Sequence, residues 1–454
     1  MLVKPVSEDN LNEYQSQPRK ALLLAFHTPE ISTAEQAESL DELKELALSA
    51  GFNVAGHLVQ VRERMDPGRV FGTGKLSQIK DLLHQLDADT AIFDGNLSPA
   101  QGQHLEKSLK VLVLDRTQLI LDIFSRNART REARLQVELA ELEYMLPRLV
   151  GMWAHLDRER GGIAGSKGTG EKQIDIDRTL VRNRIARLKK DLQHVARERS
   201  TQKKRRTANC FRVSLVGYTN AGKTTLMNRL TDSRQVAEDR LFATLDSTTR
   251  VMDPMMRPKV LLSDTVGFIR KLPHELVASF HSTLEVALDA DLLLHMVDLS
   301  HESWEDHIRT TEAALEEIGA STVPRILLFN KVDRVDEKVK QLLARNSHPG
   351  ALFLSAVSED LTPLKERIVQ FFDKSMVTTP LMLEYADYGE LTKIYQWSRV
   401  DEVRYESDGI HLTVTSTPAN LDRIRAKLHV EDEPVSKEAA SETLLQTGTH
   451  PGGQ

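Results

Sequence analysis

A glycine-bounded loop near the middle of the chain has the residue types and spacing of a phosphate-binding site. It begins at Gly217 and ends at Gly222, Lys223 and Thr224, after an apolar run and before a helical pattern. The loop's backbone N–H groups and the N-terminus of the next helix can face a polyphosphate, which a side chain at either glycine would hit. Lys223 can reach the outer phosphates, and the Thr224 hydroxyl can ligate Mg²⁺. This order favours a nucleotide site over a plain glycine turn.

Two further segments supply what a metal-bound phosphate needs. Asp264 ends a buried-strand pattern and begins the arrangement D-x-x-G, in which the carboxylate holds the metal through water and the N–H of Gly267 meets the terminal phosphate. A threonine before this strand should complete the metal shell. Thr244, Thr248 and Thr249 all satisfy that role on chemistry alone.

The third and fourth segments predict the base. Asp333 ends the sequence N-K-V-D after another buried-strand pattern, and its carboxylate can accept two hydrogen bonds from the N–H edge of guanine. Adenine presents no such donor pair, so the predicted ligand is GTP. Asn330 supports the carbonyl side of the ring, Lys331 covers the base with its apolar stem, and a backbone N–H in residues 355–357 meets the guanine carbonyl. The predicted GTP-binding residues are Gly217, Tyr218, Thr219, Asn220, Ala221, Gly222, Lys223, Thr224, Thr225, Phe242, Ala243, Thr244, Leu245, Asp246, Asp264, Thr265, Val266, Gly267, Asn330, Lys331, Val332, Asp333, Ser355, Ala356 and Val357.

The residue after Gly267 is unusual for a site that hydrolyses a phosphate. Many GTPases place a glutamine there to orient water, whereas this chain has Phe268. A phenyl ring cannot position water, so we expect Phe268 to be a core residue and the catalytic group or its ordering to come from outside. Intrinsic hydrolysis should therefore be slow.

Length and composition set limits on the rest of the chain. The chain has 454 residues, of which 40% are hydrophobic and 28% charged, with a formal net charge of −6. No apolar run approaches the ~20 residues of a membrane span, and the first residues do not resemble a secretory signal, so we expect a cytoplasmic protein. Because the whole chain is acidic, any nucleic-acid contact must come from local basic patches.

The pattern of apolar runs predicts an α/β protein with several units. The predicted GTPase domain has a mostly parallel sheet with helices on both faces, and a small α+β domain follows it. The expected units are an N-terminal α/β domain over residues 1–115, a helical hairpin with a glycine-rich loop over 116–206, the GTPase domain over 207–375, the α+β domain over 376–430 and a disordered tail over 431–454.

The N-terminal domain shows a strand and helix rhythm. Strand-like runs occur at residues 22–26, 54–59, 90–94 and 111–114, with helices over 34–50 and 76–86. A glycine-rich segment over residues 66–75 resembles an anion-binding loop, but it lacks a second phosphate-loop signature. A structural turn is the favoured interpretation there.

The predicted hairpin has one long helix from Thr117 to Pro147 and a second one with apolar residues from Ile174 to Val195. Its tip, residues 158–170, contains five glycines among basic residues, which suits insertion into a crowded anionic target better than an idle linker. Residues 182–206 have eleven lysines and arginines against two acidic residues, so their local charge is +9. This composition favours contact with an RNA backbone over a solvated face. The candidate RNA-binding residues are Arg160, Lys167, Lys172, Arg182, Arg184, Arg187, Lys189 and Lys190.

Several segments besides the nucleotide motifs are distinctive. They are L-S-P-A-Q at 97–101, D-R-T at 115–117, L-D-I-F at 121–124, L-Q-V-E-L-A at 135–140, F-A-T-L-D at 242–246 and L-P-H-E-L-V at 272–277. With these segments, the chain resembles the HflX GTPases, of the translation-factor-related class, over nearly all of residues 20–430. One departure follows the glycine-rich loop, where the family usually has E-T-Q-L-E-x-D-R-R and this chain has E-K-Q-I-D-I-D-R-T at 171–179.

The resemblance implies particular roles and partners. It selects Thr244 as the metal-sensing threonine, with Thr224 and the water-linked Asp264 as the other Mg²⁺ contacts. It implies GTP-dependent binding to the large ribosomal subunit and its rRNA, and splitting or rescue of stalled ribosomes under stress, by a protein that we expect to be a monomer. The alternative is a nucleotide-gated RNA-binding module that acts in ribosome assembly or RNA remodelling. Docking of the hairpin would act on the GTPase loops through its covalent connection to Phe211.

Overall fold

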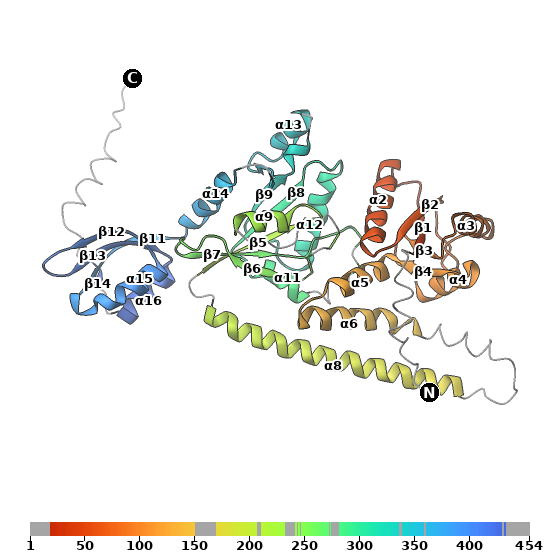
Figure 1. Ribbon diagram of the computed structural model, residues 1–454, viewed down its shortest axis with the longest axis horizontal. Helices are drawn as coiled ribbons and strands as arrows, with labels where there is room; N and C mark the ends of the chain where they lie inside the picture. Colours follow the sequence, from red (N-terminus) through yellow and green to blue (C-terminus); the bar gives the residue numbers. More distant parts are fainter. Residues whose placement is uncertain are drawn as a thin grey trace, which may run out of the picture.

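The structure is a computed structural model, and three sheets stand in a row along its longest axis (Figure 1). It describes residues 19–149, 169–206, 210–231, 241–242, 244–245, 247–271, 273, 281–335, 338–357, 360–428 and 431–432. Of the helices in these ranges, none combines the length and the apolar composition that a bilayer span requires. The predicted α/β class is confirmed, and the predicted unit boundaries at 115, 206, 375 and 430 stay a prediction.

The first sheet has four parallel strands in the order β2-β1-β3-β4. The run ALLLAF in the central strand is apolar without alternation, as expected for a strand covered by helices on both faces. The elements of this unit are β1 Lys20–His27, α2 Thr33–Ser49, β2 Asn53–Val61, α3 Thr73–Leu86, β3 Thr90–Phe93, α4 Pro99–Leu109 and β4 Leu112–Asp115.

Two local features of the N-terminal unit bear on the sequence-based predictions. Helix α4 was not predicted, although Ser98 and Gln101 form a capping box and Pro99 occupies the first turn. The glycine-rich segment 66–75 is a turn that leads into α3 at Thr73, because the Asp66 carboxylate accepts hydrogen bonds from the N–H groups of Gly68 and Arg69 at 2.8 and 2.9 Å. The favoured structural interpretation of that segment therefore holds.

The predicted long helix from Thr117 to Pro147 was wrong in its continuity. It is two helices, α5 Arg116–Asn127 and α6 Arg131–Met145, because Ala128 is extended and the Thr130 hydroxyl caps a new helix at Ala133 N. Helix α8 Thr169–Arg206 then runs back along α6 in the opposite direction (Figure 1). The two helices form the expected antiparallel pair.

Helix α8 is more exposed than its apolar pattern indicates. Ion pairs connect Arg184 to Glu138 and Lys189 to Glu143, both on α6. Leu188 is fully buried, whereas Ile176 and Leu180 are 53% and 61% exposed. Only part of the apolar pattern therefore packs against α6.

The second sheet has six strands in the order β10-β9-β8-β5-β7-β6, with β6 antiparallel to β7. Its strands are β5 Cys210–Gly217, β6 Thr248–Val251, β7 Lys259–Asp264, β8 Leu292–Asp298, β9 Arg325–Asn330 and β10 Leu352–Phe353. Its helices are α9 Lys223–Leu230, α11 His281–Leu288, α12 Trp304–Glu317, η2 Val332–Arg334, α13 Lys338–Ser347 and α14 Thr362–Asp373. The carboxyl ends of β5, β7 and β9 meet at one edge of this sheet, where parallel α/β sheets place their ligand sites.

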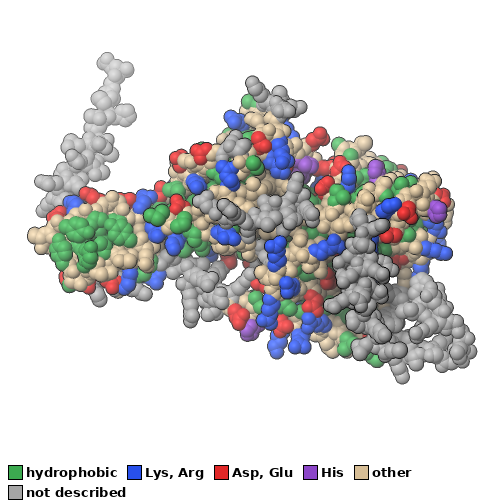
Figure 2. Space-filling view, viewed as in Figure 1, with side chains coloured by type: hydrophobic (Ala, Val, Ile, Leu, Met, Phe, Trp, Pro, Cys, Tyr) green, Lys and Arg blue, Asp and Glu red, His purple; other side chains and the backbone are tan. Residues whose placement is uncertain are grey.

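The third sheet belongs to the predicted small α+β unit and has the order β12-β13-β11-β14. Its elements are β11 Val377–Leu383, η3 Tyr385–Glu390, α15 Leu391–Trp397, β12 Arg399–Tyr405, β13 Ile410–Ser416, α16 Pro418–Leu428 and β14 Glu431–Asp432. This unit lies at the far end of the molecule from the first sheet and shows a hydrophobic patch on the viewed face (Figures 1 and 2). Four of its tyrosines are about half exposed or more: Tyr385, Tyr388, Tyr395 and Tyr405.

One hydrophobic core joins the first two units. Leu43 and Leu46 of α2 and Phe124 of α5 belong to the same buried cluster as Leu245 and Ile269 of the GTPase unit. The N-terminal unit is therefore packed directly on the GTPase unit, and the residues that it covers lie in the loops that contain Thr244 and Phe268.

Candidate active site

The loop after β5 has the conformation that its glycines allow. Gly217 and Gly222 have φ of 148° and 93°, in the region that favours glycine. A Cβ at Gly217 would overlap Met296 O of β8, and one at Gly222 would overlap the Asn330 side chain. Both positions therefore require glycine for packing within the protein, in addition to the approach of a phosphate.

Lys223 lies inside the loop. Its ammonium donates hydrogen bonds to the carbonyls of Gly217 and Tyr218 at 3.1 and 2.8 Å. Burial lowers the pKa of Lys223 to about 8, against the opposing pull of Asp264. A phosphate held by the loop would offset this desolvation with its own charge, which is consistent with the predicted role of Lys223.

The three predicted metal contacts come together. The Thr224 hydroxyl donates to Asp264 Oδ2 at 2.6 Å and lies 2.9 Å from the Thr244 hydroxyl. Asp264 is fully buried, which raises the pKa of its carboxyl, and its Oδ1 has no hydrogen-bond partner among the described residues. Three oxygens with an unpartnered carboxylate oxygen fit Mg²⁺, a cation that prefers oxygen ligands. Thr249 instead bonds Ser263 at 2.8 Å, so Thr244 is the better choice.

The predicted guanine-binding residues line one cavity of about 170 Å³. Asn330 connects the loops around it, since its amide donates to Ala221 O at 2.8 Å and its carbonyl accepts from Ala356 N at 2.9 Å. The Lys331 ammonium pairs with Asp298 at 2.8 Å, and Val332 lies in η2 beside the cavity. The residues that line the cavity are Asn220, Gly222, Thr225, Asn330, Lys331, Asp333, Arg334, Ser355, Ala356 and Val357.

Phe268 is a core residue, as expected. Its ring is 3% exposed and packs with Val216, Leu293 and Leu315. Its backbone is fixed to the phosphate loop, because Phe268 N donates to Gly217 O at 3.1 Å and Thr219 N donates to Phe268 O at 2.8 Å. The strand-end segment and the phosphate loop therefore move as one piece, and the phenyl group contributes no polar atom to the site. Thr265 faces away from the site, with its hydroxyl on Leu215 O at 2.6 Å, and Val266 is buried.

The loop that precedes β6 is attached to the N-terminal unit. The Leu241 N–H donates to the Ser49 hydroxyl at 3.2 Å, and the Asn127 amide donates to Phe242 O at 2.8 Å. The Phe242 ring meets Phe124 edge-on with centroids 4.8 Å apart. Ala243 and Asp246, also predicted here, lie outside the described residues.

The side chain of Tyr218, in the phosphate loop, lies in the same interface. Its hydroxyl donates to Glu42 of α2 at 2.6 Å and accepts from Arg270 N at 2.9 Å. Its ring stacks on His307 of α12 with centroids 3.8 Å apart. The side chain of Tyr218 therefore makes an interdomain contact, and the predicted contact of this residue with GTP stays a prediction.

A buried ionic network extends this interface to the loop after Gly267. The Arg116 guanidinium is fully buried and pairs with Glu42 at 2.8 Å and Asp94 at 2.9 Å. Asp94 also accepts from the Lys271 ammonium at 2.8 Å, and Arg116 donates to Arg270 O at 3.2 Å. Burial raises the pKa of the Asp94 carboxyl, but Lys271 and Arg116 outweigh it and hold the pKa below its ordinary value.

Sequence reasoning missed this network. The partners Tyr218 and Glu42 are 176 positions apart, and Lys271 and Asp94 are 177 apart, so no local spacing connects them. The sequence suggested that the two halves communicate through the covalent connection at Phe211, and that route stays a prediction. The contacts described here form a second, non-covalent connection. The described contacts reach the phosphate loop and both flanking loops through space.

The predicted RNA-binding residues fall into two groups. Arg182, Arg187 and Lys190 are exposed on α8, and Arg184 and Lys189 are exposed but ion-paired to α6. Lys and Arg side chains mix with acidic ones along the lower edge of Figure 2, where α8 runs. Arg160 and Lys167 lie outside the described residues, and so does the side chain of Lys172.

The parallel sheet, the loop at the end of β5 and the guanine cavity at the end of β9 define a P-loop GTPase. Three family models match: a GTP-binding GTPase N-terminal region over residues 37–125, a GTP-binding GTPase middle region over 127–206, and a 50S ribosome-binding GTPase over 212–331. The chain is 40% identical to GTPase HflX of Magnetococcus marinus, over 92% of this chain and 97% of that one. It is 39% identical to GTPase HflX of Gluconacetobacter diazotrophicus, over 90% and 97%.

The chain belongs to the HflX family of GTPases. Among solved structures, it is similar to a GTP-binding protein from Sulfolobus solfataricus in complex with GDP. That similarity has a TM-score of 0.42 and 24% identity, over 78% of this chain and 99% of that one.

Proposed function

We propose that this protein is a GTP-hydrolysing, magnesium-dependent switch that binds the large ribosomal subunit in the cytoplasm and splits or rescues stalled ribosomes under stress. The observation that best supports a switch is the convergence of Thr224, Thr244 and Asp264 beside loops that are packed on the N-terminal unit. The family model described as a 50S ribosome-binding GTPase supports the choice of partner.

The residues of this chain would divide the work as follows. Thr224 and Thr244 would hold Mg²⁺ directly and Asp264 through water, and the ion would neutralise charge that develops on the phosphates. Lys223 would bind the outer phosphates, and Asp333 would select guanine. Each of these side chains would bind or orient GTP, and Phe268, at the position where many GTPases have a water-orienting glutamine, is in the core.

Slow intrinsic hydrolysis follows from this arrangement. A partner can supply a group, or can order the loops of Thr244 and Phe268, and supplied groups in this chemistry are worth about 10³ to 10⁵ in rate. The N-terminal unit contacts both loops, so its docking on RNA would change their order. Ribosome binding through α8 would thereby reach the nucleotide.

The test is GTP turnover by the full-length protein with and without purified large subunits. We expect stimulation of at least about 10³-fold. Sedimentation of whole ribosomes with the protein and either GTP or a non-hydrolysable analogue then distinguishes ribosome splitting from the alternative, an RNA-binding module. Separation of subunits with both nucleotides supports splitting, whereas unchanged particles with either support the RNA-binding module that acts in assembly or remodelling.

The contribution of α8 is measured by charge reversal. Arg187→Glu should lower ribosome affinity and reduce the slope of log affinity against log salt by roughly 0.7 to 0.9, the contribution of one phosphate contact. Lys374→Glu, an exposed substitution just after α14, is the matched control and should leave the slope unchanged. Equal slopes in both variants would return α8 to a solvated face.

A further inference from the structure

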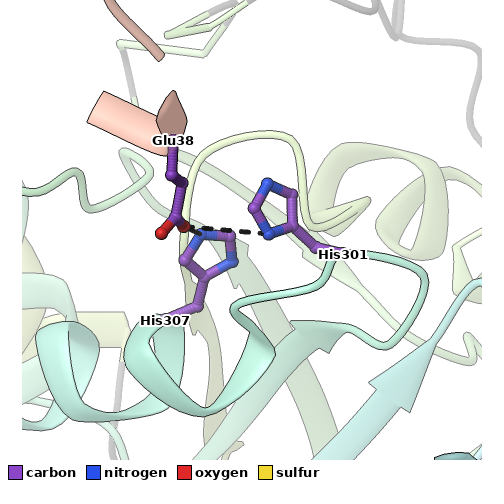
Figure 3. Close-up of side chains that lie close together, drawn as sticks. All are labelled: Glu38, His301 and His307. Carbon is purple, nitrogen blue, oxygen red and sulfur yellow. Dashed lines mark ion pairs between the residues drawn. The ribbon is translucent and has the colours of Figure 1, made fainter. Parts of the chain in front are cut away.

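Three side chains with metal-binding atoms meet where the N-terminal unit covers the GTPase unit. Glu38 comes from α2, His301 from the loop after β8, and His307 from α12 (Figure 3). Their ligand atoms all lie within 4.8 Å of one another. Glu38 Oε1 is 4.0 Å from His301 Nδ1 and 3.9 Å from His307 Nε2. The chain thus brings together two imidazoles and one carboxylate from two units.

The state of these groups suits a metal. The side chains of His307 and Glu38 are 8% and 13% exposed, and His307 faces the carboxylate with its Nε2 atom. His301 Nδ1 is unprotonated, because it accepts a hydrogen bond from Ser303 N at 3.2 Å, and a metal ion on this nitrogen would displace that bond.

The cluster is accessible. It lies on the wall of a cavity of about 610 Å³ between the two units, which is also lined by Tyr218, Thr219 and Asp41. An ion can enter from solvent, and water can fill a remaining coordination position. His301, whose side chain is 42% exposed, stands at the solvent side.

One cation already competes for the carboxylate. The Arg270 guanidinium lies 2.9 Å from Glu38 Oε1, and it also approaches Glu42 Oε2 at 3.7 Å. A divalent ion on Glu38 would displace Arg270 toward Glu42. The ion pair and the metal site are therefore alternative states of the same carboxylate.

We propose that Glu38, His301 and His307 form a site for a divalent transition-metal ion of the zinc class, with water as a fourth ligand. Two imidazoles and a carboxylate form a zinc-type donor set, whereas Mg²⁺ prefers oxygen alone. With bonds of about 2.0 to 2.1 Å, tetrahedral ligand atoms lie roughly 3.4 Å apart. Each distance from Glu38 to a histidine must therefore shorten by about half an ångström, and the distance between the two histidines by up to about 1.4 Å. Rotation of the half-exposed His301 and release of Arg270 allow that contraction.

The site goes beyond the proposed switch because it regulates the interface itself. The ion would bridge α2 and α12, and His307 stacks on Tyr218 of the phosphate loop. It would also free Arg270, three residues after Gly267. Metal binding would therefore strengthen the contact between the two units. It would also move Arg270, in the loop that follows β7, from Glu38 to Glu42.

The test is titration of metal-free, full-length protein with Zn²⁺ in the presence of GDP and excess Mg²⁺, which keep the nucleotide site filled. Competition with a chromophoric chelator gives affinity and stoichiometry, and Co²⁺ reports tetrahedral geometry by its visible absorption. We expect one tight ion per chain, and a loss of affinity of about tenfold or more in His301→Ala and in Glu38→Gln. His301→Cys, which restores a zinc ligand, should recover binding.

Asp408→Asn is the control, since Glu406, Asp408 and His411 form the other cluster of this kind in the described residues. It should leave the tight ion in place. Zinc binding that is absent, or that survives both His301→Ala and Glu38→Gln, would overturn the proposal. Neither result bears on GTP turnover with ribosomal subunits, so the proposed switch is tested separately.

Discussion

The guanine cavity and the interface beneath the phosphate loop lie on two sides of the same glycine-rich segment, and they are built differently. Asn330, Asp333 and Ala356 come from the ends of neighbouring strands of one sheet. Tyr218 and Arg270, by contrast, contact Glu42 and Glu38 of α2, in the N-terminal unit. The predicted guanine site is thus internal to the GTPase unit, whereas the phosphate loop and the loops of Thr244 and Phe268 also contact the N-terminal unit. Affinity and turnover should therefore respond to different substitutions.

The largest expected effect belongs to the interface. Arg116→Leu leaves Glu42 and Asp94 buried without their shared cation, and breaking such a pair costs about 3 to 5 kcal/mol of unfolding free energy. Chemical denaturation of the nucleotide-free protein measures the loss. Arg404→Leu is the control, an exposed arginine with ion pairs in the third unit, and should cost under about 1 kcal/mol. Similar costs for the two variants would contradict a buried network that joins the units.

The guanine cavity should give a specific effect on affinity. Asp333→Asn leaves the donor pair of guanine unmatched and should weaken GTP binding by at least ~2 kcal/mol, or about 30-fold. Titration with a fluorescent nucleotide measures this loss. Xanthosine triphosphate, which has a carbonyl in place of the guanine amino group, should bind the variant better than GTP does. Equal affinity of the unaltered protein for ATP and GTP would exclude the guanine assignment.

Tyr218→Phe sharpens the comparison within the phosphate loop itself. It keeps the ring on His307 but removes the hydroxyl between Glu42 and Arg270 N, which should cost about 1.5 to 3 kcal/mol of unfolding free energy. GTP affinity should stay within about threefold, since the hydroxyl bonds Glu42 and Arg270 N in the interface, while turnover changes. A loss of affinity as large as that of Asp333→Asn would mean that Tyr218 contacts the nucleotide.

The smallest expected effect is a change in how folding stability depends on pH, and it comes from His295 in the GTPase sheet. Burial, with Arg325 and Lys223, lowers the pKa of His295 to about 3, against 6.5 for the free group. The unfolded chain therefore binds a proton that the folded chain does not, and stability is lost as pH falls below 6.5, by up to about 1.4 kcal/mol per unit. His295→Leu should remove about 1 kcal/mol of the loss between pH 6.5 and 5.5 in denaturation curves. Identical pH dependence in both proteins would show that His295 is protonated in the fold.

The sequence predicts the site where chemistry dictates local spacing. Gly222, Thr224 and Asp264 are placed as expected because each follows directly from a strand end and a phosphate or metal requirement. Helix boundaries were predicted less accurately, as the break before Thr130 shows. An N-cap residue can end one helix and begin another although the apolar pattern continues through it. The interface was not predictable from one sequence, because Glu42 and Asp94 are ordinary acidic residues until the fold buries them against Arg116.

The core shared by the two units has a consequence for synthesis of the chain. Helices α2 and α5 leave the ribosome long before Leu245 and Ile269, the residues that cover them. At about 5 to 20 residues per second, the 125 residues from Tyr144 to Ile269 take on the order of ten seconds to translate. During that interval the apolar surface around Leu46 and Phe124 lacks its cover from the GTPase unit, so binding of a chaperone would protect the nascent chain from aggregation.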